Sequence, residues 1–370
     1  MAAAARILYE GFVDDKQSLA LGGAQNYIYH LAQVLLSIGI RPIVYQSAKA
    51  AFSVEIDGCE VRGVAGARSS KDVLRAIGQG EHDYDNDLLI FGTDFLICKN
   101  AFRHSVAIQH GVAWDITRSR PASDLQNCAA IFKGAFRALK KYLRYRHCEN
   151  LVCVDYNFIN WYRTQVASVG LRCFMIPNFA LACEEGLARA EGGPVSVVFA
   201  RRLVPYRGTR LFAEAIRPLL EKYPELRVTV AGTGPDEVWM KKALGGFKNV
   251  SFTSYSVNDG VRFHSAFDIA VVPTRGSEGT SLSLLEAMSA GCAVVATNVG
   301  GMTNIVLDGF NGRLISPDAD ELRNTIEELI LDPQKRAFLA AHAAETVRTS
   351  FSHEKWAEAW KKAVRTILEQ

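Results

Sequence analysis

Short apolar runs alternate with longer segments of helical periodicity along almost the whole chain, and this alternation constrains the fold more than any other feature. The segment Ala24–Ser37 carries apolar residues at helical spacing and ends before Gly39. Strands separated by such segments indicate βαβ units, so we predict an α/β fold with doubly wound parallel sheets. The strands predicted in the first half are Ala5–Tyr9, Pro42–Tyr45, Leu88–Phe91, Ser105–Gln109 and Leu151–Val154.

A second series of strands and helices follows a break near Ile176–Phe179 and a polar stretch over Cys183–Pro194. We therefore predict two Rossmann-like domains, over residues 1–179 and 180–352. The last helix, about 353–370 with Ser352 as its N-cap, is expected to pack back on the first domain. The strands predicted in the second half are Val195–Ala200, Arg227–Ala231, Val250–Phe252, Ile269–Val272, Ala293–Ala296 and Arg313–Ile315.

The composition excludes several classes of protein. The chain has 370 residues, of which 49% are hydrophobic, so it can bury substantial cores and is not intrinsically disordered. A net charge of +3 is too small for a chain that binds nucleic acid along its whole surface. Its eight cysteines show no zinc-binding or CxxC spacing, so we expect reduced thiols and no metal site. No apolar stretch is long enough to span a bilayer, and we expect a soluble protein that at most rests on a membrane surface.

One acidic residue stands alone in a long apolar segment. Between Gly279 and Leu307 the only charged side chain is that of Glu286, so we expect a buried carboxylate that needs a partner. That partner can be an internal arginine, backbone amides or a ligand, and the residues alone leave these alternatives open.

The start of the same segment predicts a site for a phosphate. Gly279, Thr280 and Ser281 predict a turn from a strand into a helix, with a capping hydroxyl. The helix start offers free N–H groups and the positive end of the helix dipole. Glu286 on the helix and Glu278 before it can accept hydrogen bonds from hydroxyl groups. A phosphate between two such carboxylates describes a nucleotide sugar, with the ribose at one and the hexose at the other.

Glu278 and Glu286 also form a Glu-x7-Glu pattern, in which the chain resembles the family-four retaining glycosyltransferases. The segments VVFARRLVPYRGTRLFAEAI, VTVAGTGPD, EGTSLSLLEAMSAGCAVVATNVGGMTNIVLDGFNGRLISPDAD and IPNF resemble that family in the same order along the chain. The resemblance implies the GT-B fold, in which two Rossmann-like domains have parallel sheets that face each other across a cleft. It also implies a nucleotide-sugar donor and no metal ion.

The resemblance assigns further residues of the second domain to the donor. Arg202 and Arg207 fall where the family binds the donor diphosphate, although position 207 is usually a lysine, and Arg201 is expected to be a surface neighbour. A solvated helix start is the alternative for this basic cluster. Gly232 and Gly234 match the family's glycine turn, whose plain use is tight packing. Thr253–Val257, with Tyr255 at its centre, is expected to line the base pocket through backbone contacts.

Two features of the first domain also match the family. Gly22 and Gly23 resemble a glycine loop that faces the leaving phosphate, and the alternative is a turn that begins a helix. His110 follows a predicted strand where the family often has a histidine close to the reacting sugar; a histidine at such a position can equally be structural. The resemblance therefore gives Glu278, His110, Arg202 and Arg207 as catalytic residues.

Residues 132–146 combine six cations and no acid with apolar residues at helical spacing. Such a helix can rest on an anionic membrane or receive a lipid-linked acceptor, and an ordinary solvated helix is the alternative. The cations are Lys133, Arg137, Lys140, Lys141, Arg144 and Arg146, and the apolar residues are Phe132, Phe136, Leu139 and Leu143.

The resemblance implies a retaining, metal-independent enzyme, and we expect that it needs no cofactor. It would move a hexose-type sugar from a UDP- or GDP-sugar to a saccharide, glycolipid or small-molecule hydroxyl, in cell-surface polysaccharide or glycoconjugate synthesis. We expect a cytoplasmic location, with peripheral contact at the inner face of the membrane. The alternatives are another GT-B activity, such as an epimerase or a phosphorylase, and a non-catalytic protein that binds sugar nucleotides. A dinucleotide-dependent oxidoreductase is disfavoured because no GxGxxG follows a predicted strand.

Overall fold

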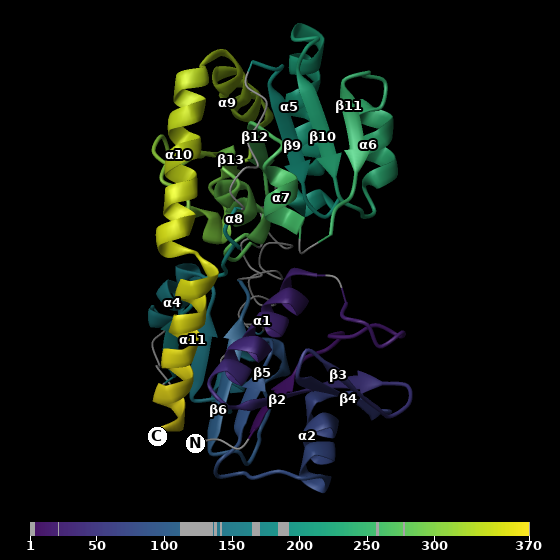
Figure 1. Cartoon of the computed structure of the whole chain (residues 1–370), viewed down its shortest axis with the longest axis vertical. Coiled ribbons are helices and arrows are strands. Elements are labelled where there is room, and N and C mark those ends of the chain that lie inside the picture. The colour runs from purple at the N-terminus through teal and green to yellow at the C-terminus, as the bar shows by residue number, and fades with distance from the viewer. Residues whose placement is uncertain are drawn as a thin grey trace. The chain divides into compact units, whose positions relative to one another are not determined.

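The structure is a computed structural model, which describes residues 4–20, 22–111, 136, 139–140, 143–164, 171–183, 192–256, 259–276 and 278–369. These residues form two compact units, each with a central sheet and helices (Figure 1). Unit 1 takes in the described residues of 1–110, 118–176 and 357–370, and unit 2 those of 111–117 and 177–356. None of the helices in these ranges is both long enough and apolar enough to cross a membrane.

Unit 1 is built on an eight-stranded sheet with the order β3-β4-β2-β1-β5-β6-β7-β8. All neighbouring strands are parallel except β3 and β4. Its described elements are β1 (Ala4–Leu8), α1 (Gly23–Ser37), β2 (Arg41–Ala48), β3 (Phe52–Ile56), β4 (Cys59–Ala65), α2 (Ser70–Gln79), β5 (Leu88–Phe91), η1 (Asp94–Leu96), β6 (His104–Gln109), β7 (Asn150–Cys153), α4 (Tyr156–Arg163), β8 (Arg172–Met175) and the greater part of α11 (His353–Leu368).

Strands β3 and β4 form an antiparallel hairpin that the sequence analysis did not predict. Asp57 and Gly58 make its two-residue turn with φ of 47° and 79°, and Ile56 pairs with Cys59. Two successive positive φ angles are typical of the tight turns that join antiparallel strands, and Asp-Gly is a preferred pair for them. The hairpin therefore adds an antiparallel edge to an otherwise parallel sheet.

Unit 2 is built on a six-stranded parallel sheet with the order β11-β10-β9-β12-β13-β14. Its described elements are β9 (Ser196–Ala200), η2 (Pro205–Arg207), α5 (Thr209–Lys222), β10 (Arg227–Ala231), α6 (Glu237–Leu244), β11 (Val250–Thr253), α7 (Gly260–His264), β12 (Ile269–Val272), α8 (Leu282–Ser289), β13 (Ala293–Thr297), η4 (Gly300–Asn304), β14 (Arg313–Ile315), α9 (Ala319–Leu331) and α10 (Pro333–Ser350). This is the Rossmann strand order, and it reverses direction between β9 and β12. The prediction of two Rossmann-like units is confirmed.

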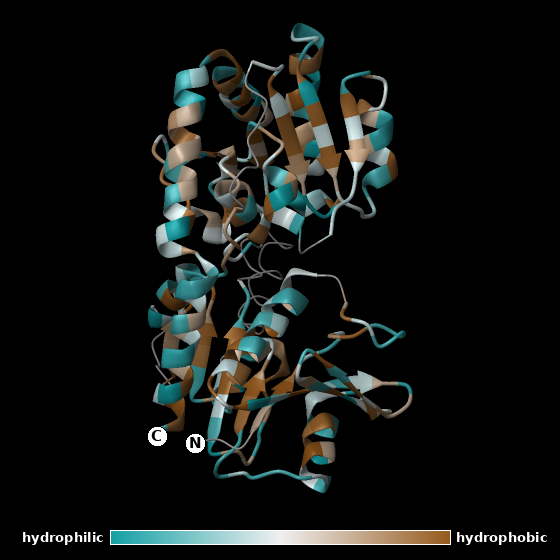
Figure 2. Ribbon diagram, in the orientation of Figure 1, coloured by the Kyte–Doolittle hydropathy of each residue, from teal (hydrophilic) through white to brown (hydrophobic). Residues whose placement is uncertain are grey.

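Both faces of the unit 2 sheet are covered, which explains why its strands are continuous apolar runs. Successive residues of a strand point to opposite faces. Phe199 accordingly belongs to the core cluster that includes α5, α6 and α9, whereas Val198 belongs to the cluster that includes α8 and α10. Figure 2 shows these strands as mostly hydrophobic, with hydrophilic residues on the helices around them.

Two glycines after β10 hold the loop after β9 in place. Gly232 and Gly234 have φ of 134° and 154°, and a side chain on either would overlap the carbonyl oxygen of Arg201 or Leu203. The same two loops are joined by hydrogen bonds from the Arg201 N–H to the Ala231 carbonyl, 2.9 Å, and from the Leu203 N–H to the Thr233 carbonyl, 2.8 Å. The close approach fixes the backbone at Arg201, at the carboxyl end of β9.

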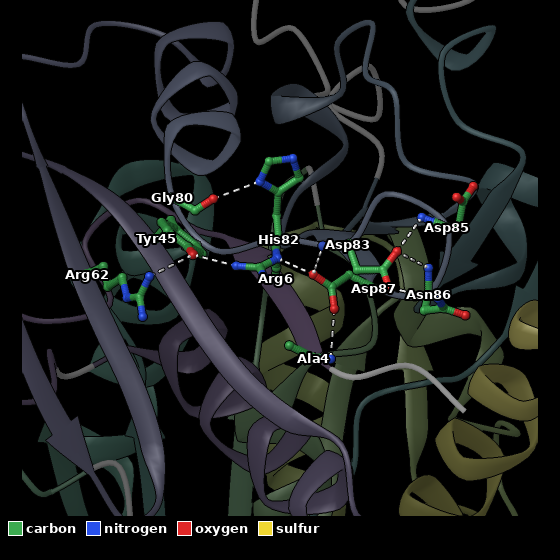
Figure 3. A network of polar contacts seen from close by, with 10 residues as sticks. All are labelled: Ala4, Arg6, Tyr45, Arg62, Gly80, His82, Asp83, Asp85, Asn86 and Asp87. Carbon is green, nitrogen blue, oxygen red and sulfur yellow. Dashed lines mark hydrogen bonds and ion pairs between the residues drawn. The ribbon is translucent and has the colours of Figure 1, made fainter.

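In unit 1 a buried ion pair joins the first strand to the loop before β5 (Figure 3). Arg6 donates from Nε to Asp87 Oδ2 at 2.6 Å and from Nη1 to the Tyr45 hydroxyl at 2.9 Å. Asp87 also accepts from the backbone N–H of Ala4 and of Asp83. The Arg6 and Asp87 side chains are only 5% and 1% exposed, so each charge depends on the other for compensation.

The last helix of the chain packs on the first. In unit 1, Trp360 of α11 donates from Nε1 to the hydroxyl of Tyr27 on α1 at 2.8 Å, and both side chains are buried. The chain therefore returns to unit 1 after forming unit 2, with the change between units at 356–357.

We expect Asp87→Asn to lower the free energy of unfolding by about 3–5 kcal/mol, because it leaves the Arg6 charge buried without a counter-ion. Urea denaturation followed by circular dichroism measures the change. Glu237→Gln is the matched control, because it breaks the exposed Glu237–Lys241 pair on α6, and such pairs contribute about 0.2–1 kcal/mol. Equal effects of the two substitutions would contradict this account of the Arg6–Asp87 pair.

We expect Gly232→Ala to destabilise unit 2 by about 1–3 kcal/mol, since the new methyl group meets the Arg201 carbonyl at a backbone angle that L-residues rarely adopt. Thermal unfolding measures the loss. Gly246→Ala is the control, because a side chain at that exposed glycine meets nothing within 4 Å. A Gly232→Ala variant as stable as Gly246→Ala would show that the loop relaxes without cost.

Candidate functional site

A carboxylate paired with two arginines lies where β9 and β12 end, at the point where the strand order of unit 2 reverses. Glu278 is buried, and its Oε2 accepts from Arg201 Nη2 at 2.7 Å and from Thr274 Oγ1 at 2.9 Å. Arg207 Nη1 donates to the same oxygen. Open α/β sheets bind ligands outside the carboxyl ends of the strands at such a reversal. Of the two predicted glutamates, it is Glu278 that the chain's own arginines hold.

The arginines after β9 differ from the sequence prediction in one respect. Arg201, expected on the surface, is only 8% exposed and donates to Thr274, to Glu278 and, at 3.4 Å, to Ser281 Oγ. The expectation for Arg201 was wrong, because adjacent residues of an extended segment point to opposite sides and it is Arg202 that is exposed. Burial lowers the pKa of Arg201 to about 10, which still leaves it a cation at neutral pH.

Arg207 is the more accessible arginine on Glu278. It ends the short helix η2, its side chain is 24% exposed, and its guanidinium lies 5.2 Å from the centre of the Tyr206 ring. Burial, followed by the neighbouring charge of Arg201, lowers the pKa of Arg207 to about 10. Two cations therefore share one carboxylate.

Glu286 has no counter-ion in the part of the chain that the structure describes. It lies on α8 and is partly buried, and its carboxylate makes no hydrogen bond or ion pair with any described residue. Burial raises the pKa of its carboxyl to about 7. A Cβ atom on Gly260 would lie 2.6 Å from both carboxylate oxygens, so the absence of a side chain there leaves room for them. An internal arginine was one of the expected partners of Glu286, but the arginines of this site pair with Glu278 instead. Glu286 is also less buried than expected.

The turn before α8 leaves the first N–H groups of the helix without a side-chain cap. Ser281 is the N-cap residue but makes no capping hydrogen bond, so the predicted capping hydroxyl was wrong. Its Oγ lies 3.4 Å from Arg201 Nη2 and from Ser283 Oγ instead.

Thr280 is buried, and its carbonyl accepts from Asn178 Nδ2. The Gly301 N–H bonds the Glu278 carbonyl at 2.9 Å, next to Gly279. Asn178 and Gly301 were not predicted as site residues, although both lie in segments that carry the resemblance.

An aromatic pair lies beside Glu286. Tyr255 stacks on Phe263 of α7, with ring centres 4.4 Å apart and planes 4° apart. Burial and the charge of Glu286 raise the pKa of Tyr255. Phe263 was not predicted, and only its place after the Thr253–Val257 segment could have indicated it; Val257 itself lies outside the described residues. Gly232 and Gly234 lie at the same sheet edge and contact the backbone at Arg201 and Leu203.

Gly22, Gly23 and His110 belong to unit 1, and the residues above belong to unit 2. Gly22 is the N-cap residue of α1 and makes no side-chain cap, and Gly23 is the first residue of that helix. The two glycines thus lie where a helix begins, and the role assigned to them at the leaving phosphate stays a prediction.

His110 directly follows β6 and is fixed by two contacts. Its Nε2 lies 2.9 Å from the Gly92 carbonyl, and its ring meets that of Tyr27 edge to face at 5.3 Å. Burial lowers the pKa of His110. Because a carbonyl can only accept, Nε2 carries the proton of the neutral ring, and Nδ1 is left as a hydrogen-bond acceptor.

Two further expectations concern the basic segment 132–146 and the presence of a metal site. Of the basic segment 132–146, Phe132, Lys133, Arg137 and Lys141 lie outside the described residues. Within the described ranges, no group of three or more His, Cys, Asp or Glu side chains could hold a metal ion.

Known proteins match this chain both in sequence and in fold. Residues 194–332 match the family described as "Glycosyl transferases group 1". The phosphatidyl-myo-inositol mannosyltransferase of Mycolicibacterium smegmatis is 28% identical over 193 residues, which are 50% of this chain and 50% of that protein. The chain thus spans about half the length of the curated relatives it matches.

Solved structures match nearly the whole chain. Sucrose-phosphate synthase from Thermosynechococcus elongatus has a TM-score of 0.78 at 15% identity and covers 99% of both chains. Anabaena HepE, in complex with UDP-glucose, has a TM-score of 0.70 at 19% identity over 98% of this chain and 99% of its own. At these identities the likeness shows the fold alone. The predicted resemblance is confirmed: residues 194–332 match the group 1 glycosyltransferases, and the chain has the two-domain fold of the solved structures.

Proposed function

We propose that the chain is a retaining glycosyltransferase. It would move a hexose-type sugar from a UDP- or GDP-sugar to a hydroxyl of a saccharide, glycolipid or small molecule, in cell-surface polysaccharide or glycoconjugate synthesis. The observation that carries the proposal is that Glu286 is a partly buried carboxylate without a counter-ion among the described residues. Glu286 lies on α8. The first residues of this helix have no side-chain cap, and they lie at the edge of the sheet where ligands of this fold bind.

Each part of a nucleotide sugar has a chemical counterpart in unit 2. Glu286 would accept the ribose hydroxyls, and the stacked pair of Tyr255 and Phe263 offers an aromatic surface for the base. The start of α8 and Arg207, with the exposed Arg202, would hold the diphosphate. Glu278 would accept hydroxyls of the sugar. We assign the donor to the second domain, predicted as 180–352, and the acceptor to the first, predicted as 1–179.

The chemistry these residues supply is mainly electrostatic. When the bond from the anomeric carbon to the diphosphate breaks, negative charge grows on the departing oxygen. The cations and helix N–H groups stabilise that charge. We propose that the acceptor oxygen bonds to the anomeric carbon on the face that the phosphate leaves, and that the departing phosphate takes the proton of that hydroxyl. Attack on that face retains the anomeric configuration, while Glu278 orients the ring. His110, with Nδ1 as acceptor, would receive a hydroxyl of the donor sugar or the acceptor.

Two observations from the comparisons support a nucleotide-sugar donor. The match over residues 194–332 covers the cluster around Glu278 and the whole of α8. Anabaena HepE, which has this fold, was solved in complex with UDP-glucose.

The alternatives are another GT-B activity, an epimerase or a phosphorylase, and a protein that binds sugar nucleotides without turnover. A thermal-shift screen of UDP- and GDP-sugars identifies the donor, because a ligand that binds the folded state raises the melting temperature. Release of nucleoside diphosphate that depends on an added acceptor separates transfer from epimerisation and from binding alone. No stabilisation by any nucleotide sugar would contradict the proposal.

An exposed surface of unit 1 supports peripheral contact with an anionic membrane on the cytoplasmic side. Large apolar side chains alternate there with cations, as on helices that lie in a membrane interface. Lys140 Nζ lies 4.8 Å from the Phe136 ring centre, and Arg144 lies 5.9 Å from that of Phe95. The apolar residues are Phe95, Phe136, Leu139 and Leu143, which are 65%, 58%, 53% and 46% exposed.

Donor binding is expected to weaken as the pH falls from 8 to 6. A carboxylate holds hydroxyl groups best when ionised, and the pKa of Glu286 is raised to about 7 by burial, so protonation removes the better acceptor. Calorimetric titration with UDP-glucose and GDP-mannose measures the dissociation constant. Glu286→Gln is expected to bind about tenfold or more weakly at pH 8, with little change between pH 6 and 8.

The stability of the same variant is the control. A raised carboxyl pKa means that ionised Glu286 destabilises the fold, so stability is lost as the pH rises through about 4.5 to 7. Glu286→Gln should therefore be at least as stable as the wild type at pH 8. A less stable variant, or a wild type whose donor affinity is constant from pH 6 to 8, would contradict the role of Glu286.

Binding to vesicles is expected to require both negative lipid charge and the apolar residues of unit 1. The double variant Leu139→Asp/Leu143→Asp should reduce co-sedimentation with phosphatidylglycerol-containing vesicles about tenfold or more, since it places charge where apolar area would enter the interface. Leu331→Asp, at a 63% exposed leucine of unit 2, is the control. Equal binding to vesicles of pure phosphatidylcholine would contradict the electrostatic part of this proposal.

A further inference from the structure

The two arginines on Glu278 are held very differently. Arg201 directly follows β9, its backbone is bonded to Ala231, and its carbonyl oxygen lies against Gly232. Its side chain is 5% exposed and donates to three side chains at once. Arg207 lies on a single short turn, is 24% exposed, and is bonded through its side chain to Glu278. Arg201 is therefore a fixed partner of Glu278, and Arg207 is the one with freedom to leave.

The cluster also carries more positive than negative charge. Arg201 and Arg207 both donate to Oε2 of Glu278, and Oε1 accepts from no described residue. A diphosphate arriving at the sheet edge would offer Arg207 an anionic partner with stronger charge. If Arg207 were the only cation on Glu278, its departure would leave a buried carboxylate bonded to Thr274 alone, which is costly.

We propose that Arg201 is a positioning residue that keeps Glu278 ionised and in place while Arg207 moves from Glu278 to the donor diphosphate. The proposal rests on the proposed function and assigns a role that the sequence analysis did not give to Arg201. Because Arg201, Arg207 and Thr274 all bond Oε2, Oε1 remains available to accept a hydroxyl of the donor sugar. Arg207 thus exchanges its ion pair with Glu278 for one with the donor, and the ion pair between Arg201 and Glu278 is kept.

The test uses the pH dependence of kcat for release of nucleoside diphosphate from the donor, which reports groups in the donor complex. UDP-glucose and GDP-mannose are the probes, in the full-length chain. We expect Arg201→Gln to move the acid limb of the profile up by about one pH unit or more, because an ionised Glu278 loses its permanent counter-ion. Arg201→Lys, which restores the charge, should reverse most of that shift.

Arg210→Met is the matched control, because Arg210 is an exposed arginine of the same region that lies over Trp239 at 4.6 Å and not on Glu278. Its profile should equal that of the wild type. The other titratable and charged groups around the cluster stay unchanged in all these variants; they are Arg202, Tyr206, Arg207, Tyr255 and Glu286. An unshifted acid limb in folded Arg201→Gln would overturn the proposal.

A second measurement keeps the proposal testable if Arg201→Gln does not fold. In a Glu278→Gln background Arg201 has no carboxylate to position. Adding Arg201→Gln, which makes the pair neutral on both sides, should therefore change kcat by less than about threefold. A loss of tenfold or more from the added substitution would show that Arg201 acts other than through Glu278, and would overturn the proposal. A wild type that binds no nucleotide sugar would instead overturn the proposed function.

Discussion

The ion pair between Arg201 and Glu278 depends on the strand order of unit 2. Because the order reverses between β9 and β12, the chain leaves these neighbouring strands in opposite directions and the segments after them border the same space. Arg201 comes directly after β9, and Glu278 comes six residues after β12. The glycines after β10 then fix the backbone at Arg201 from the other side. The charge network therefore depends on three neighbouring strands, β10, β9 and β12, which are paired in one sheet.

The apolar strands and the apolar helices could be predicted from the sequence, and the hairpin could not. β9, β12 and β13 are buried on both faces, so their runs of Val, Ile, Ala and Phe stand out. β3 and β4 are the outermost pair, and only three of their twelve residues are buried, which leaves little apolar contrast. The Asp57-Gly58 turn was the one available signal for them. β8 has no fully buried residue and was missed for the same reason.

The residues of the candidate site could be proposed from the sequence, but their contacts could not. Sequence indicated two glutamates and a cluster of arginines, and all of them lie in unit 2. It could not indicate which of the adjacent Arg201 and Arg202 points inward, because that depends on the register of the residues just after β9. It also could not indicate which glutamate is paired, because the apolar residues after Gly279 bury one side of α8 and leave Glu286 partly exposed.

The two carboxylates therefore have opposite environments, and this suits the opposite tasks that we propose for them. Glu278 is surrounded by two cations and a hydroxyl, so its charge is compensated before any ligand arrives. Glu286 is next to an aromatic ring and a glycine, and the pKa raised by its burial leaves its charge to be compensated by what binds. A group that must hold a reacting sugar in one orientation benefits from the first arrangement, since nothing has to be reorganised during the reaction. A group that recognises the ribose benefits from the second, because its unpaired state favours the ligand over the empty site.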